Sequence, residues 1–236
     1  MPARVELYTI LPMESTIAEI GVFNGANAIN IYNTSRPKEL WLVDTWEITP
    51  DFPAQERVYM AEKQVRREFG DKDAVKILKQ SSIEASKMFS NHYFDWVFID
   101  ASHEYKDVKA DLAYWLPKIK KGGYLCGHDL TFDPGGKWPG TEGAVIEFLL
   151  KYVIKSPKVL EKLTSLYGTN WYDSSETPPE TLVEYIFKET GKLSDSFGSE
   201  IFYITESRAR SYKLQIGDWV DDLDYEEIIE EAGKTI

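Results

Sequence analysis

Short apolar segments alternate with amphipathic segments over the first 130 residues. Five of them have the length and composition of buried strands, namely 17–22, 40–44, 74–79, 94–100 and 124–129. Four others have apolar positions at helical spacing, namely 26–33, 54–69, 82–89 and 105–116. Strands that alternate with helices indicate βαβ units. We therefore predict an α/β fold with a doubly wound, mostly parallel sheet and helices on both faces.

After residue 130 the pattern is less regular. The remaining predicted elements are a Gly- and Pro-rich loop at 131–143, helices at 144–154 and 180–190, strands at 160–173 and 200–206, and an acidic helix at 219–233. We expect this last helix to pack Ile228 and Ile229 on the body; an interaction tail is the alternative. The prediction is a single domain over 1–236, with its core at about 14–155 and later strands, helices and acidic tail at 156–236.

The composition excludes several classes of protein. A hydrophobic content of 43% over 236 residues, with 14% aromatic residues, is typical of a folded domain and not of a disordered chain. The formal net charge is −12, and such a charge repels phosphate groups. We therefore expect neither nucleic acid nor a membrane as a partner.

The expected compartment is the cytoplasm. Cys126 is the single cysteine, so no internal disulfide can form, as is usual in a reducing compartment. The N-terminal segment has a lone Arg4 and an early proline and does not resemble a signal peptide. No window approaches the twenty consecutive apolar residues that a spanning helix needs.

A glycine-containing turn follows the first predicted strand. Parallel sheets bind ligands beyond the carboxyl ends of their strands, and the run from Glu19 through Gly21 to Gly25 leaves a strand and enters a helix. Glycines let a backbone approach a ligand closely. The spacing is G-x-x-x-G and lacks the G-x-G-x-x-G pattern of dinucleotide-binding proteins. An ordinary strand-to-helix turn is the alternative interpretation.

Asp44 ends the second predicted strand. A carboxylate at this place can accept hydrogen bonds from both hydroxyls of a ribose. Taken alone, such a residue is more often a helix cap or a solvated side chain. Together with the glycine turn upstream, it favours a nucleoside-type ligand.

A third group of polar residues follows the fourth and fifth predicted strands. Asp100 and His103 come after one strand, and His128 and Asp129 end the next. Carboxylates can hold a divalent cation, and histidine is a base near neutral pH. The alternative is that His128 and Asp129 bond only each other and cap a loop. His92 lies in a polar turn, and we interpret it as a surface residue.

The order of these motifs resembles the class I S-adenosylmethionine-dependent methyltransferases. The segments concerned are E-x-G-x-x-x-G, LVDTW, QSS, DWVFIDASHEY and KKGGYLCGHD, and the resemblance covers about 16–148. Within the class, the sequence is most similar to the bacterial branch related to macrocin O-methyltransferase and cephalosporin hydroxylase proteins, and more distantly to catechol O-methyltransferase. The resemblance implies a seven-stranded, Rossmann-like sheet whose last strand is antiparallel.

The resemblance also implies which residues bind S-adenosylmethionine. The turn from Gly21 to Gly25, with Glu19 before it, would cradle the methionine part of the cofactor. Asp44 would bind the ribose. Trp46 and Ser82 would lie on the adenine side.

The same resemblance implies which residues act on the methyl acceptor. Asp100 matches the family's metal-binding aspartate, which also borders the cofactor, and His128 and Asp129 match the pair that completes the metal site. His103 matches the general base. Metal-dependent relatives carry two oxygen ligands at this pair, and magnesium prefers oxygen. Hence His128 faces away, or the site takes a softer ion such as manganese, iron or zinc, or no metal binds.

The predicted function is O-methylation of a small hydroxylated molecule such as a sugar or a phenol, with His103 and Asp100 as catalytic residues. A neutral hydroxyl is a poor nucleophile, so a base, a metal or both would help. The segment 133–141 with Trp138 is a lid or a passive connection, and the aromatic segment 167–172 lines the acceptor pocket or belongs to the core. A homodimer is also expected. The alternatives are a non-catalytic S-adenosylmethionine-binding scaffold and a nicotinamide-dependent oxidoreductase.

Overall fold

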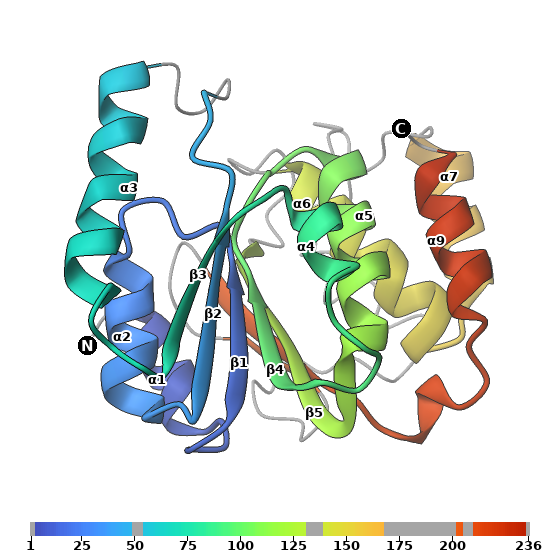
Figure 1. Ribbon diagram of the computed structural model, residues 1–236. Helices are drawn as coiled ribbons and strands as arrows, with labels where there is room; N and C mark the ends of the chain where they lie inside the picture. The colour runs from blue at the N-terminus through green and yellow to red at the C-terminus, as the bar shows by residue number, and fades with distance from the viewer. Residues whose placement is uncertain (1–2, 49–53, 131–138, 168–201, 205–209, 235–236) are drawn as a thin grey trace.

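A single seven-stranded sheet organises the chain. The computed structural model describes residues 3–48, 54–130, 139–167, 202–204 and 210–234. The strands are β1 (Thr16–Ile20), β2 (Glu39–Asp44), β3 (Val75–Lys79), β4 (Phe94–Ile99), β5 (Ile119–Leu130), β6 (Phe202–Ile204) and β7 (Arg210–Gln215). Their order in the sheet is β3-β2-β1-β4-β5-β7-β6 (Figure 1). The first five strands are parallel, whereas β7 runs antiparallel to both β5 and β6. The predicted sheet and its antiparallel last strand are confirmed.

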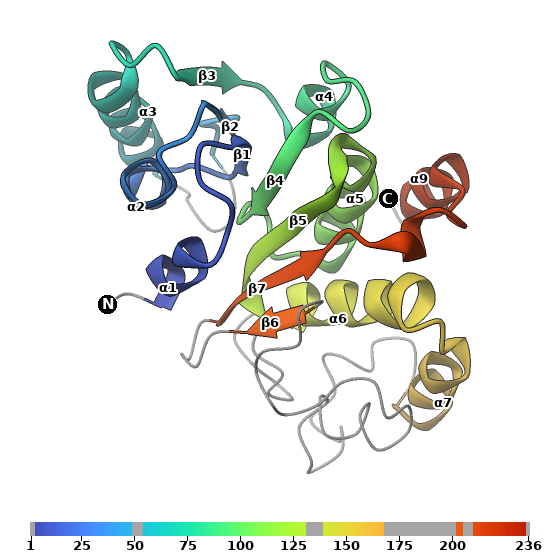
Figure 2. The same ribbon diagram turned by 90° about the horizontal axis from the view of Figure 1, so that it is seen from below.

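Helices cover both faces of this sheet. They are α1 (Ala3–Thr9), α2 (Ala26–Ser35), α3 (Gln55–Phe69), α4 (Ser82–Ser86), α5 (Tyr105–Trp115), α6 (Pro139–Phe148), α7 (Pro157–Tyr167) and α9 (Tyr225–Gly233), with short turns η1 (Leu116–Lys118), η2 (Leu149–Val153) and η4 (Asp218–Val220). Figure 2 shows α1, α2 and α3 on one face and α4, α5 and α6 on the other. The N-terminal helix α1 therefore belongs to the helical layer of the sheet.

Alternating side chains of the strands divide the core into two halves. In β4, Trp96 and Phe98 face the cluster formed with α1, α2 and α3, whereas Val97 and Ile99 face the cluster formed with α5 and α6. Each of these side chains is at most 5% exposed. Cys126 of β5 lies in the first cluster and is fully buried. Strands buried on both faces explain the continuous apolar runs in the sequence.

Two predictions for the region after residue 130 are wrong within the described residues. The segment 160–173, predicted as a strand, begins inside helix α7, where Val159 and Leu163 are buried one turn apart. The predicted loop 131–143 is already helical from Pro139, because proline suits the first turn of a helix. The helix predicted at 180–190, the aromatic segment at 168–172 and most of the 133–141 segment, including Trp138, lie outside the described residues.

The acidic C-terminal helix is confirmed. Helix α9 packs on α5, where Ile228 is 5% exposed and contacts the same cluster as Ala113, and Ile229 is partly buried. Glu231 of α9 also binds Lys151 and accepts a hydrogen bond of 2.9 Å from Tyr152. These contacts make the helix part of the folded body.

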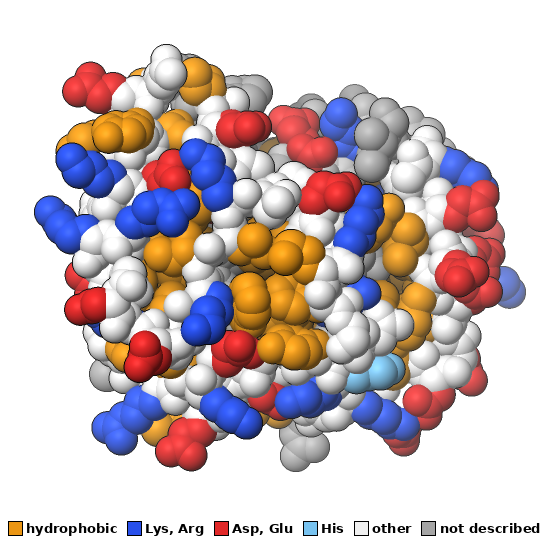
Figure 3. All heavy atoms as spheres, in the orientation of Figure 1, with side chains coloured by type: hydrophobic (Ala, Val, Ile, Leu, Met, Phe, Trp, Pro, Cys, Tyr) orange, Lys and Arg blue, Asp and Glu red, His pale blue; other side chains and the backbone are white. Residues whose placement is uncertain are grey.

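The surface carries charges of both signs. Figure 3 shows Lys and Arg side chains interspersed with Asp and Glu on one face, while apolar side chains gather between α3 and α4. His92 is exposed, as expected. None of the described helices combines the length and apolar character needed to cross a bilayer.

Candidate active site

The strand register places four predicted site residues in one row. Ile20 of β1 pairs with Val43 on one side and Ile99 on the other, and Ile99 pairs with Gly127. The next residue along each of the four strands is Gly21, Asp44, Asp100 or His128. Because these strands are parallel, all four residues lie at the carboxyl edge of the sheet.

The backbone at Gly21 runs against the β4 strand end. Gly21 has φ +88°, and a Cβ atom placed there would overlap the carbonyl oxygen of Asp100. Its N–H donates to Val43 O at 2.9 Å, so the turn is held from both neighbouring strands. A side chain at this position is excluded by conformation and by space.

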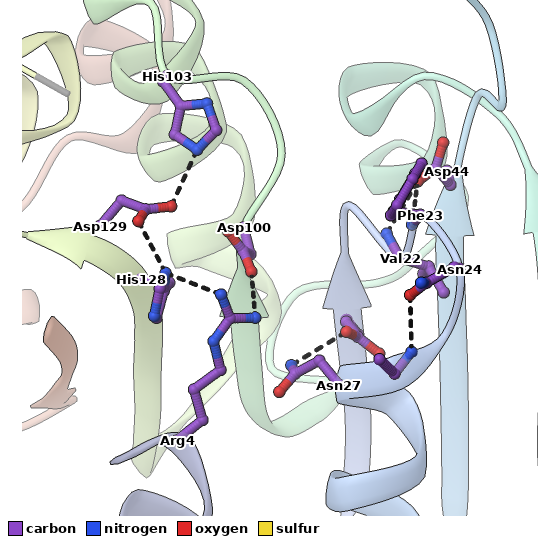
Figure 4. Close-up of polar contacts among 12 residues, drawn as sticks. Arg4, Val22, Phe23, Asn24, Asn27, Asp44, Asp100, His103, His128 and Asp129 are labelled. Atoms are coloured by element: carbon purple, nitrogen blue, oxygen red, sulfur yellow. Dashed lines mark hydrogen bonds and ion pairs between the residues drawn. The ribbon is translucent and has the colours of Figure 1, made fainter. Parts of the chain in front are cut away.

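Asp44 organises the turn that follows. Its Oδ2 accepts hydrogen bonds from the backbone N–H groups of Val22 at 2.9 Å and Phe23 at 2.8 Å (Figure 4). Its Oδ1 accepts from the N–H of Trp46 at 2.7 Å. The carboxylate therefore fixes the backbone around the cavity while its remaining lone pairs can still accept from a ligand.

Gly25 closes the turn at the start of α2. It has φ +78° and caps the helix in the left-handed region, and its Cβ position faces Val65 of α3. Gly25 supports the turn but does not line the cavity described next.

A cavity of about 480 Å³ opens at the carboxyl ends of β1, β2 and β4. This volume is in the range of small-molecule sites. Six carboxylate side chains line it, and the described lining contains no lysine, arginine or histidine; the six are Asp44, Glu47, Asp100, Glu104, Asp107 and Asp111. Such a wall favours a ligand with positive charge and disfavours one with phosphate groups.

Trp46 and Ser82, which the resemblance places on the adenine side of the cofactor, both border the cavity. The indole N–H of Trp46 donates to Phe23 O at 2.8 Å, which fixes the ring. The Ser82 hydroxyl donates to Asp111 Oδ1 and accepts from Trp115 Nε1 at 2.8 Å. Burial raises the pKa of Asp111 to about 7, with the Ser82 hydrogen bond acting in the opposite direction. Asp111 is a cavity residue that the sequence analysis did not single out.

Glu19 lies behind the cavity wall and not in it. Its side chain is fully buried, and Oε1 accepts from Asn27 Nδ2 at 3.0 Å, whereas Oε2 has no hydrogen-bond partner among the described residues. Burial raises the pKa of Glu19 to about 8. Tyr8 of α1 donates to Asn27 Oδ1 at 2.7 Å. Glu19 thus joins β1 to α2 and, through Asn27, to α1.

Arg4 reaches the strand ends from α1. Its Nη1 donates to Asp100 Oδ2 at 2.7 Å, and its Nη2 lies 3.0 Å from His128 Nδ1 (Figure 4). Burial raises the pKa of Asp100, and the Arg4 charge opposes this shift. The sequence analysis treated Arg4 as a terminal residue and missed this role. No local pattern indicates it, because 96 positions separate Arg4 from Asp100.

His103 forms a pair with Asp129. The distance from His103 Nε2 to Asp129 Oδ2 is 2.9 Å, and that from His128 Nδ1 to Asp129 Oδ1 is 3.0 Å. Asp129 has φ +61°, a conformation that turns its side chain between the two rings. Burial alone would raise the pKa of Asp129, but its contacts with both histidines outweigh burial and hold the pKa well below its usual range.

The candidate metal ligands differ from the predicted set. Asp100, His103 and Asp129 place ligand atoms within 4.8 Å of one another, and His128 is not part of this group. His128 instead faces Arg4 and Asp129. The Arg4 guanidinium is bonded to Asp100, and a cation beside a divalent ion would be strongly repelled. The arrangement in this structure therefore does not fit a divalent ion.

The structure thus divides the predicted residues into three groups. Gly21, Asp44, Trp46, Ser82 and Asp100 border the cavity. A neighbouring cluster contains Asp100, His103, His128 and Asp129 together with Arg4. Glu19 and Gly25 support the first group from behind.

Residues 18–130 match the family model described as "Methyltransferase domain". The match covers slightly less than half of the chain and shows that these residues are similar to methyltransferase domains. The match is to the domain as a whole and does not distinguish one branch. No curated protein matches the sequence.

Several solved structures are similar to this chain at low sequence identity. A protein from Corynebacterium glutamicum has 13% identity and a TM-score of 0.50, over 91% of this chain and 78% of that one. Spermidine synthase from Thermotoga maritima has 14% identity and a TM-score of 0.46, over 93% and 59%. An O-methyltransferase family protein from Burkholderia thailandensis has 11% identity and a TM-score of 0.47, over 90% and 55%. The chain spans less than two thirds of the latter two proteins.

Proposed function

We propose that the protein is an S-adenosylmethionine-dependent methyltransferase that methylates a hydroxyl group of a small molecule, and that His103 is the base that removes the hydroxyl proton. The observation that carries the proposal is the pair formed by His103 and Asp129 at the edge of the sheet, 2.9 Å apart. Asp100 connects this pair to the cofactor cavity, because it borders the cavity and belongs to the same group of ligand atoms as His103.

The cavity suits S-adenosylmethionine. When bound, this cofactor supplies an activated methyl group on a positively charged sulfur. The carboxylates of Asp100 and Asp44 favour positive charge in the cavity, and the described lining has no basic side chain that would attract the phosphates of a nicotinamide cofactor. Asp44 would accept from the ribose hydroxyls, and Trp46 offers a ring fixed by its hydrogen bond to Phe23.

The tautomer of His103 follows from its partner. A ring that donates Nε2–H to Asp129 carries its lone pair on Nδ1, and that nitrogen can accept a proton. Asp129 orients the ring and stabilises the imidazolium that forms. With the cofactor bound, the acceptor oxygen would take the methyl group, the carbon–sulfur bond would break with its electron pair left on sulfur, and His103 would take the hydroxyl proton.

The acceptor is proposed to be a small molecule and not a nucleic acid. The six carboxylates of the cavity wall and the formal charge of −12 both oppose a polyanion. A hydroxyl acceptor is favoured over an amine because a hydroxyl must lose its proton during transfer, and the His103–Asp129 pair supplies a base.

Transfer of a labelled methyl group to a panel of phenols, sugars and amines tests the proposal. We expect label in hydroxylated acceptors, and we expect His103→Ala to lower kcat by about 10²–10⁴-fold. His92→Ala is the matched control, since His92 is exposed and lies outside the site. Calorimetry with S-adenosylhomocysteine should give the same affinity for both variants as for the wild type. Label only in amines, or full activity of His103→Ala, would contradict the proposal.

The same experiment separates the alternatives. A non-catalytic scaffold would bind S-adenosylhomocysteine and label no acceptor. An oxidoreductase would bind a nicotinamide cofactor and not S-adenosylhomocysteine, which calorimetry with both ligands would show.

A further inference from the structure

The cluster of Asp100, His103, His128 and Asp129 beside the cavity includes a positive charge, that of Arg4. Arg4 bonds Asp100 with one terminal nitrogen and lies against His128 with the other, at 2.7 and 3.0 Å. Its side chain is 30% exposed, compared with 15% for Asp100. A guanidinium can donate several hydrogen bonds in a fixed plane and stays charged at all ordinary pH values. It is therefore a permanent cation at the edge of the acceptor cluster.

Helix α1 is firmly attached at this position. Leu7 and Tyr8 are fully buried and Leu11 is 4% exposed, all three in the cluster that also contains β1 and α2. The Tyr8 hydroxyl binds Asn27, which binds Glu19 of β1. The rings of Tyr8 and Trp96 are stacked, with 6.0 Å between their centroids. These contacts hold the backbone that carries Arg4 against the sheet.

The ligand atoms beside Arg4 form an incomplete metal site. Asp100, His103 and Asp129 could each offer one atom within 4.8 Å of the others. Two carboxylates so close together repel each other unless a cation lies nearby. In this structure Arg4 is that cation for Asp100, while Asp129 is in contact with the two histidines.

We propose that Arg4 is the built-in cation of the acceptor site and takes the place of a divalent metal ion beside Asp100. If the proposed function holds, methyl transfer by this protein is then independent of metal ions. Arg4 is a positioning residue in this scheme, because its guanidinium pairs with the Asp100 carboxylate and lies against the His128 ring. The N-terminal helix is then part of the active site.

Metal binding to the full chain tests this proposal without any acceptor. Protein freed of metals with EDTA and then dialysed is titrated with Mn²⁺ in a calorimeter. We expect Arg4→Gln to bind Mn²⁺ about tenfold or more tightly than the wild type, because removal of the fixed charge opens the cluster to a cation. Arg4→Lys keeps a charge and should exclude Mn²⁺ as the wild type does. The double variant R4Q/D100N should lose the binding that Arg4→Gln gains.

Matched controls separate a charge effect from a folding effect. Arg67→Gln removes one exposed positive charge from α3 and should leave Mn²⁺ binding as in the wild type. Thermal unfolding identifies the variants that remain folded. Stoichiometric Mn²⁺ binding by the wild type, or equal Mn²⁺ affinity of wild type and Arg4→Gln, would overturn the proposal.

Activity supplies a second test that is independent of the first. Once an acceptor is found, transfer by the wild type should be unchanged by EDTA, and Arg4→Gln should be slower and recover with added Mn²⁺. Inhibition of the wild type by EDTA would overturn the proposal. If no hydroxylated acceptor is methylated, the proposed function fails, but the Mn²⁺ titrations still decide whether Arg4 replaces the metal.

Discussion

The two halves of the site are built in different ways. On the cofactor side, backbone groups of the turn after β1 are held by Asp44 from the neighbouring strand. On the acceptor side, Asp100 and Asp129 are held by side chains from distant parts of the chain, among them Arg4. The first half depends on the strand register and the second on tertiary packing.

This difference has a consequence for substitutions. A change on the cofactor side alters the backbone and should affect stability and cofactor affinity together. A change on the acceptor side alters a charge or a hydrogen bond and should affect catalysis while the fold persists. The predictions below test this division, beginning with the largest expected effect.

Gly21→Ala should have the largest effect. The added methyl group meets the Asp100 carbonyl at a positive φ, so we expect a loss of about 3 kcal/mol in the free energy of unfolding. S-adenosylhomocysteine affinity should fall as well. Urea unfolding and calorimetry measure the two effects.

Gly122→Ala is the matched control for this substitution. Gly122 has φ +84°, close to that of Gly21, but a Cβ there meets nothing within 4 Å. It should cost about 1 kcal/mol from conformation alone. Equal losses in the two variants would show that the contact with β4 is unimportant.

Asp129→Asn tests the acceptor side. Asparagine keeps the shape of the side chain but cannot stabilise a charged His103 as a carboxylate does. We expect kcat to fall about 10- to 100-fold with little change in S-adenosylhomocysteine affinity. The measurement is steady-state kinetics with calorimetry in parallel. A large loss of cofactor affinity would mean that the two halves are not separate.

Glu19→Gln tests the link between the halves, and its effect depends on pH. The pKa of Glu19 rises from 4.5 to about 8 in the fold, so the folded state keeps a proton that the unfolded state releases. Its contribution to stability is present below pH 4.5 and is lost as the pH rises toward 8. The wild type should thus lose about 1 kcal/mol per pH unit in this window, and the variant should lose less.

Urea midpoints measured between these pH values test the Glu19 prediction. Glu68→Gln is the control, because it changes an exposed carboxylate on α3. Asn27→Asp is unsuitable, because it adds a charge beside Glu19. Equal pH slopes for wild type and Glu19→Gln would show that Glu19 titrates normally.

The cofactor side could be predicted from the sequence because its geometry follows from local patterns. Buried strand segments predict a parallel sheet, and a parallel sheet brings Gly21, Asp44 and Asp100 to one edge. The sheet and its carboxyl-edge row are confirmed by the register. The binding roles of these residues stay predictions.

The acceptor side could be predicted only in part. The sequence placed His103, His128 and Asp129 together, but it could not show which ring faces Asp100. Arg4 was missed because its partners are fixed by the packing of α1. Strand β7 was missed for a similar reason: Lys213 looks solvent-exposed in the sequence, yet it is 9% exposed and lies 4.8 Å from the ring of Tyr124.

The burial of Cys126 offers a natural reporter for the whole sheet. It is the single thiol in the sequence, it is fully buried in β5, and burial raises its pKa. A thiol reagent can reach it only when the centre of the molecule opens. The rate of its alkylation therefore reports how often the core opens in the unmodified protein, with no introduced label.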